Sequence, residues 1–366
     1  MKILVIGNGF DLAHGLPTSY SNFLDFVKAC NGYLTYGTKK APFDSFCEMH
    51  SGTPLFNEIN SHINTNNRLL DFFLNIYEQR CSEGKHGWID FEKEISTIIQ
   101  ALDVARKCVI DQKYKGPVSL PPRVDPIVSA VLLTGDNGKG YGDHFPDDFE
   151  DGRVDCLLDG LNRLTRLLEI YLVEYVGSIE ISKRLPECSG VDFTHVLSFN
   201  YTDTFQKLYD SQERLKYCYI HGDSKKDSNI EKCNMVLGID EYLDQNRRNL
   251  DNCFIWFKKF YQRVYKGTDS EYIDWINLVE ENAVRYRSGN PPINEVYIYG
   301  HSLDVTDKDV LNKLITMSNT NSYIYYYSKD DLAKKIENLV KVIGEDELIR
   351  RTGGKRRTIH FVETKK

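Results

Sequence analysis

The sequence lacks several features that would assign it at once to a common class. No apolar run approaches the roughly 18 residues that a membrane-spanning helix needs. The first residues, a single Lys2 and a short apolar run that ends at Gly7, do not have the form of a signal peptide. The net charge of −7 over 366 residues argues against a general nucleic-acid-binding surface. We therefore expect a cytoplasmic protein without membrane attachment.

The cysteines are scattered and show no pairing pattern. There are nine of them, an odd number, and no C-x-x-C spacing occurs. Structural zinc sites and disulfide frameworks both need clustered or paired cysteines. We therefore expect free thiols in a reducing compartment and no bound metal.

The clearest motif is at the N-terminus. Residues 3–6 form a short aliphatic run, as expected of a strand that is buried on both faces of a parallel sheet. Gly7, Asn8 and Gly9 follow, and a helical stretch begins after them. A strand, a glycine turn and a helix N-terminus together favour binding of a nucleotide phosphate.

The same residues also allow a tight turn with no ligand. A third glycine normally follows the second by three residues, but Gly15 comes six residues after Gly9. In addition, the carboxylate of Asp11 would repel a pyrophosphate at this turn. The residues alone leave both alternatives open.

Strand and helix signals divide the rest of the chain. We expect further strands over 194–199, 215–220, 234–237, 295–299 and 322–327, and a hairpin over 348–362 that turns at Gly353 and Gly354. Helices are expected over 20–27, 69–77, 88–102, 151–182, 307–318 and 329–343, with a helical and aromatic stretch over 241–287. Residues 31–66 and 111–150 are expected to be irregular. This order predicts an α/β fold with a Rossmann-like parallel sheet, built from residues 1–30 and 192–366. Residues 31–191 are expected to form a mainly helical insertion.

Polar side chains follow four of the expected strands. Asn8, Asn200, His221 and Ser302 each come just after a strand ends. The carboxyl ends of parallel strands share one edge of the sheet, where ligands bind, so these residues are expected to converge. Each residue also has a simpler explanation, because Asn200 can cap a helix, His221 can bond to a turn, and Ser302, with His301 before it, can begin a helix.

Four segments resemble the bacterial phage abortive-infection family AbiH. They are Gly7-Asn-Gly-Phe-Asp-Leu-Ala-His-Gly-Leu-Pro-Thr-Ser-Tyr20, Ser198-Phe-Asn-Tyr-Thr-Asp203, Ile220-His-Gly222 and Tyr299-Gly-His-Ser-Leu-Asp304 with Thr306-Asp307. The likeness covers both ends of the chain, and in the helical middle it is limited to Trp88-Ile-Asp-Phe-Glu92. It implies a role in a defence response in which an infected cell stops growing or dies.

The same segments are similar, more distantly, to the sirtuin-like (or DHS-like) NAD-binding fold. Gly7, Gly9 and Gly15 match the glycine spacing of that fold, and Phe199-Asn200, His221-Gly222 and Gly300-His301-Ser302-Leu303 match its later motifs. Two features depart from the sirtuin pattern. Thr18-Ser19-Tyr20 replaces its Asp-Phe-Arg, and its four-cysteine zinc module is absent.

These departures make protein deacylation doubtful, and the resemblance implies hydrolysis of NAD instead. It implies Asn200 and His221 as catalytic residues, because an amide can orient a water molecule and an imidazole can accept its proton. The residues expected to hold the nucleotide are Gly7, Asn8, Gly9, Asp11, Asp203, Gly300, His301 and Ser302.

Other classes of function stay open at this point. The alternatives to NAD hydrolysis are a nucleotide-binding sensor that does not turn its ligand over, and a hydrolase of another nucleotide or nucleic acid. The helical insertion is a candidate for recognition of a phage or host protein, and self-association into a homo-oligomer is also left open.

Overall fold

The chain folds into two compact units in a computed structural model, which describes residues 1–65, 67–84, 89–112, 122, 126–128, 152–244, 246–248, 250–268, 270–286 and 292–364. Unit 1 contains Met1–Thr18, Val176–Ser224 and Lys266–Lys366. Unit 2 contains Ser19–Tyr175 and Lys225–Tyr265. The expected division at residues 30 and 192 differs from this one, chiefly because 225–265 groups with the helical unit.

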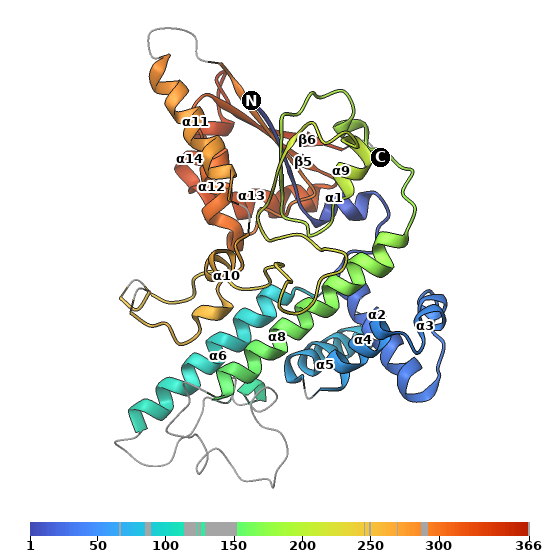
Figure 1. Cartoon of the computed structure of the whole chain (residues 1–366). Helices are drawn as coiled ribbons and strands as arrows, with labels where there is room; N and C mark the ends of the chain where they lie inside the picture. The colour runs from blue at the N-terminus through green and yellow to red at the C-terminus, as the bar shows by residue number, and fades with distance from the viewer. Residues whose placement is uncertain are drawn as a thin grey trace. The chain divides into compact units, whose positions relative to one another are not determined.

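Unit 1 is built on one six-stranded sheet in which every neighbouring pair is parallel (Figure 1). The strands are β1 (Lys2–Ile6), β2 (His195–Ser198), β3 (Lys216–Tyr219), β4 (Asn294–Tyr299), β5 (Thr320–Tyr326) and β6 (Ile359–Glu363). Their order across the sheet is β3-β2-β1-β4-β5-β6, which is the doubly wound Rossmann order. The α/β, Rossmann-like prediction is therefore confirmed.

Strand β1 is central and buried on both faces, as its aliphatic run predicts. Leu4 lies opposite Val196 of β2 and Tyr297 of β4. The side chains of Ile3 and Val5 are wholly buried on one face, and those of Leu4 and Ile6 are buried on the other.

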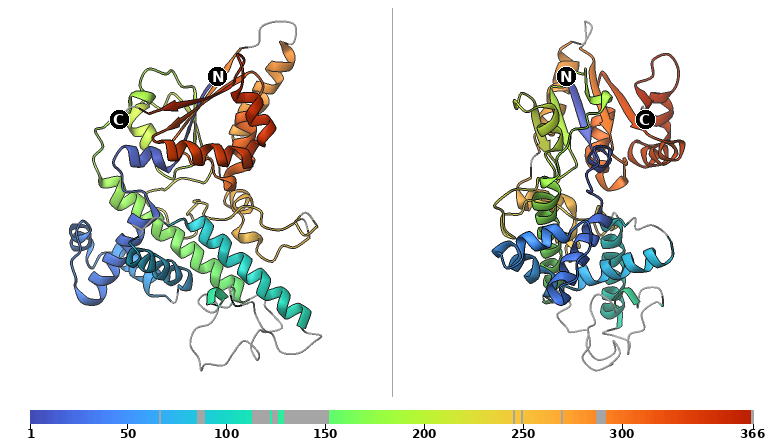
Figure 2. Two further views of the ribbon diagram at one scale, coloured as in Figure 1. Left: turned by 180° about the vertical axis from the view of Figure 1, so that it is seen from behind. Right: turned by 90° about the vertical axis from the view of Figure 1, so that its right-hand side faces the viewer.

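Helices cover the two faces of the sheet unequally. The helices of unit 1 are α1 (Asn8–Ala13), α9 (Thr204–Tyr209), α11 (Tyr272–Arg285), α12 (Lys308–Thr316), α13 (Lys329–Ile343) and α14 (Glu345–Thr352). Apolar side chains of α11 to α14 pack on the face that contains Ile3 and Val5, and Figure 2 shows the orange and red helices on that side. On the other face Phe10 of α1 and Phe205 of α9 pack on Leu4 and Ile6.

Unit 2 is mainly helical and has an aromatic core. Its helices are α2 (Tyr20–Tyr36), α3 (Asp44–His50), α4 (Pro54–Asn64), α5 (Arg68–Ser82), α6 (Phe91–Gln112), α8 (Gly152–Ile170), which continues into a π-helical turn over Tyr171–Tyr175, and α10 (Lys259–Lys266). The rings of Phe73 and Phe91 stack at a centroid distance of 4.3 Å. No helix of unit 1 or unit 2, within the described ranges, is long and apolar enough to span a bilayer.

Two stretches differ from the sequence expectation, for identifiable local reasons. Residues 31–66 are not irregular, since they contain the end of α2 together with α3 and α4. The signal for α4 is Thr53, which caps the helix directly before Pro54. Residues 348–362 do not form a hairpin. Acidic residues in the first turn of α14 and arginines in its last turn favour a helix there, and β6 then pairs in parallel with β5.

The strand expected over 234–237 does not form, although residues 235–237 are buried. The side chain of Gln262 accepts a hydrogen bond from Leu237 N at 3.1 Å and donates one to Leu237 O at 2.9 Å. At Leu237 a side-chain amide thus supplies the backbone hydrogen bonds that a neighbouring strand would otherwise make. Trp88 and nearly all of the stretch 111–150 lie outside the described residues.

Candidate functional site

The candidate site of unit 1 lies at the carboxyl edge of the sheet. In this strand order, β1 connects to a strand on one side, and the chain later crosses to β4 on the other side. Ligands of open α/β sheets bind where the direction of winding reverses in this way. The segments that follow β1, β2, β3 and β4 contain every residue that the sequence analysis selected.

The glycine turns after β1 and β4 pack directly against one another. A Cβ atom at Gly300 would lie 2.1 Å from Phe10 N, and a Cβ at Gly9 would lie 2.8 Å from the backbone of Gly300. Gly7 N donates to Tyr299 O at 3.1 Å, Gly9 N donates to Gly300 O at 2.8 Å, and Phe10 N donates to Gly7 O at 2.8 Å. These glycines therefore allow the two turns to contact each other, and two of the backbone amides expected to hold a phosphate, those of Gly7 and Gly9, already have partners.

A buried carboxyl group lies beside this contact. Asp11 is only 1% exposed, and its Oδ2 accepts a hydrogen bond from the Thr202 hydroxyl at 2.5 Å. Thr204 donates in turn to the Thr202 hydroxyl at 3.1 Å. Burial raises the pKa of Asp11 to about 6, although the hydroxyls and the nearby Asn200 amide oppose the rise. Asp11 is therefore poised to change its charge near neutral pH.

Asn200 lies against this carboxyl and is itself buried. Its Oδ1 and Nδ2, like Oδ1 of Asp11, make no hydrogen bond of normal geometry to any described residue. Its backbone is held by the Ser198 hydroxyl, which accepts from Asn200 N at 3.1 Å and donates to Asn200 O at 3.0 Å. The amide is thus fixed in place with unused hydrogen-bonding capacity.

Two buried histidines share one carboxylate at the same edge. Nε2 of His221 lies 3.2 Å from Oδ1 of Asp307, and Nε2 of His301 lies 3.4 Å from Oδ2. Phe199 separates the two imidazoles and meets both edge-on, at centroid distances of 5.4 and 4.2 Å. One carboxylate thus lies within ion-pair distance of both imidazoles, where an aspartate can orient such rings.

The surroundings of His301 fix its tautomer. Leu303 N donates to its Nδ1 at 2.9 Å, so Nε2 is the nitrogen that holds the proton and faces Asp307. The backbone oxygen of His301 accepts from the buried Lys335 ammonium at 2.6 Å. His301 therefore has a supporting role in this structure, whereas His221 is the better candidate for proton transfer.

The structure brings only some of the predicted residues together. Asp11 lies beside Asn200, and His221 and His301 lie beside the same carboxylate, that of Asp307. Asn8, Asp203 and Ser302 are exposed, and Asp203 pairs at the surface with Lys207 at 2.8 Å. Sequence reasoning missed the roles of Thr202 and Asp307, although both belong to the segments that carry the family resemblance.

Among the described residues, no group of three His, Cys, Asp or Glu side chains is arranged to hold a metal ion.

Comparison with known proteins identifies a family. Residues 3–328 match the family model described as Bacteriophage abortive infection AbiH, which covers most of the chain. No curated protein and no solved structure matches the chain.

Proposed function

We propose that this chain, which belongs to the AbiH family and serves in abortive-infection defence against bacteriophage, hydrolyses the N-glycosidic bond of NAD or a related nucleotide. The observation that carries the proposal is the set of unused hydrogen-bonding atoms on Asp11 and Asn200. Buried polar atoms normally have partners, so such atoms need an explanation. The hydroxyls of a bound ribose, together with one water molecule, would supply the missing partners.

Asp11 is suited to stabilise the charge that develops during this reaction. When the bond to nicotinamide breaks, the ribose becomes positively charged in an oxocarbenium-like transition state. With a pKa of about 6, Asp11 is mostly ionised at neutral pH. A buried carboxylate stabilises a nearby cation more strongly than an exposed one, because little water screens it.

Asn200 and His221 supply the remaining chemistry. The Asn200 amide can accept from a ribose hydroxyl while it donates to the attacking water. As the water oxygen bonds to C1′ of the ribose, its proton passes to His221, and nicotinamide leaves as a neutral molecule. The products are ADP-ribose, nicotinamide and one proton, so the step balances without a metal or an oxidant. Asp307 orients the His221 ring throughout.

The decisive experiment measures nicotinamide release from NAD by the purified protein. We expect His221→Ala and Asn200→Ala each to lose roughly 10²–10⁴-fold in rate. The matched controls are His360→Ala and Asn321→Ala, since both residues are half-buried on other strands of the same sheet. The controls should retain the parent rate, and thermal melting should show that all four variants fold.

The outcomes separate the proposal from its alternative. Full turnover by a folded His221→Ala variant would remove this residue from the mechanism. If the parent binds NAD but never cleaves it, even in cells challenged with phage, the protein is a nucleotide sensor and the hydrolase proposal fails. A fall in cellular NAD during infection that disappears with His221→Ala would support the hydrolase.

A further inference from the structure

Unit 2 contains a cavity whose chemistry differs from that of the site in unit 1. Its volume is about 540 Å³, within the range of small-molecule sites. It is lined by Arg106 of α6 and by seven residues of the loop before α10, namely Asn246, Arg247, Leu250, Asp251, Asn252, Cys253 and Trp256. The lining combines two guanidinium groups, two amides and one indole.

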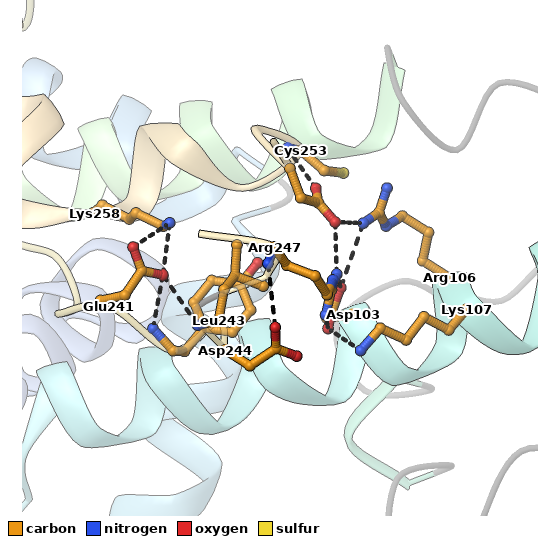
Figure 3. Close-up of polar contacts among 11 residues, drawn as sticks. Asp103, Arg106, Lys107, Glu241, Leu243, Asp244, Arg247, Cys253 and Lys258 are labelled. Atoms are coloured by element: carbon orange, nitrogen blue, oxygen red, sulfur yellow. Dashed lines mark hydrogen bonds and ion pairs between the residues drawn. The ribbon is translucent and has the colours of Figure 1, made fainter. Parts of the chain in front are cut away.

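Two carboxylates hold the two guanidinium groups in place, as Figure 3 shows for Asp103. Arg247 binds Asp103 in a bidentate manner, with Nη1 donating to Oδ2 at 2.9 Å and Nη2 donating to Oδ1 at 2.8 Å. Its Nη2 also donates to Oδ2 of Asp251 at 2.6 Å. Arg106 donates to Asp251 and, at 3.5 Å, to Asp103. The contacts use five of the ten N–H groups of the two arginines.

The N–H groups that these contacts leave unused belong to positively charged, partly buried guanidinium groups. Arg106 is only 9% exposed, and its Nε makes no hydrogen bond within the described part of the chain. Asp103 and Asp251 balance the charges of the two arginines, and the Lys107 ammonium, 3.1 Å from Asp103, leaves the cluster with one net positive charge. Burial opposes the charge of Arg106, but the nearby Cys253 thiol and Asp251 outweigh it and raise the pKa of this guanidinium. A fixed guanidinium with free donors is a typical binding group for a phosphate.

The indole beside these arginines is rigidly held. The Trp256 ring contacts Tyr261 and Tyr265 edge-on, at centroid distances of 4.7 and 5.7 Å. Its backbone oxygen accepts from the Gln262 side chain at 3.0 Å. Trp256 is nevertheless 37% exposed, so part of its ring is available to stack against a planar ligand.

We propose that this cavity is a second nucleotide site, in which Arg106 and Arg247 bind the phosphate and Trp256 stacks on the base. The amides of Asn246 and Asn252 are placed to contact the base edge or the sugar. This site consists only of residues from unit 2, and it does not depend on the hydrolysis proposed for unit 1. It gives the helical unit the function of detecting a nucleotide.

The test is calorimetric titration of the full chain with AMP, and separately with adenosine and with inorganic phosphate. We expect AMP to bind more tightly than either fragment, because each fragment lacks half of the contacts. Arg106→Lys keeps the positive charge but loses the planar guanidinium with its several donors, and Trp256→Leu loses the stacking surface. Each should weaken AMP binding by roughly tenfold or more.

Controls assign the binding to this cavity. Arg248→Gln changes an exposed arginine of the same loop that does not line the cavity, and it should bind AMP like the parent. Asn200→Ala should also bind AMP here with unchanged affinity, even if it has lost NAD turnover. AMP should quench part of the tryptophan fluorescence in the parent, and this quenching should be absent in Trp256→Leu.

Three results would overturn the inference. One is the absence of AMP binding to the parent at millimolar concentration. Another is binding that is unchanged in Trp256→Leu, which alters only the rim of the cavity and is expected to fold. The third is AMP binding that Asn200→Ala abolishes, since this would place the nucleotide in unit 1. Failure to detect NAD hydrolysis would not affect any of these measurements.

Discussion

Replacing Asp11 by asparagine should stabilise the protein at neutral pH. Burial raises the pKa of Asp11 from 3.8 to about 6, so the folded state holds this proton more tightly than the unfolded chain does. The two pKa values differ by about 2, and 1.36 kcal/mol for each pKa unit gives about 3 kcal/mol. This is the free-energy cost of keeping the carboxylate ionised and buried above pH 6.

The sign of the pH dependence follows from proton uptake. Between pH 4 and 6 the folded state binds more protons at this site than the unfolded state, so the contribution of Asp11 to stability falls as the pH rises. Below about pH 4 both states are protonated and the cost is absent. The asparagine in the Asp11→Asn variant has no charge, yet it can still accept from Thr202, and the rise of the pKa to about 6 already includes the hydrogen bonds that favour the carboxylate.

We therefore expect Asp11→Asn to be about 1–3 kcal/mol more stable than the parent at pH 7.5, and nearly equal to it at pH 4. Urea denaturation at several pH values measures this difference. Asp203→Asn is the matched control, because this carboxyl is exposed and pairs only at the surface, and its effect should stay within about 0.5 kcal/mol. A variant that is less stable than the parent at pH 7.5, or a difference that does not change with pH, would refute the reasoning.

The remaining predictions concern the turns and the histidines. Gly300→Ala should destabilise unit 1 by several kcal/mol more than Gly354→Ala, because both glycines have φ near +70° but only the first has a backbone atom within 4 Å of the new Cβ; equal melting temperatures for the two variants would contradict this. Asp307→Asn should reduce nicotinamide release roughly tenfold or more and alter the ¹⁵N tautomer signals of His221; unchanged signals would show that Asp307 does not orient the ring. Asp11→Asn should also lose NAD turnover although it gains stability, a combination typical of functional sites; retained turnover would exclude Asp11 from the chemistry.

Much of unit 1 could be predicted from local patterns. The β1 run, the helix expected over 329–343 and the position of Asn200 after β2 all depend on neighbours in the sequence, and the structure agrees with them. Two of the mispredicted stretches, 31–66 and 348–362, carry local helix signals, whereas 234–237 depends on a partner elsewhere in the chain. The backbone of Leu237 is satisfied by the side chain of Gln262, which no local pattern could indicate.

The sequence by itself determined that β1 is buried on both faces, that polar residues follow several strands, and which family the chain resembles. Periodicity and glycine spacing are local, so one sequence is enough to reveal them. Only the tertiary structure decided what these residues do. It assigned the glycines to a contact between two turns, raised the pKa of Asp11 by burying it, and placed Asp307 beside His221. These properties depend on burial and on distances between residues that are far apart in sequence, and such distances exist only once the chain has folded.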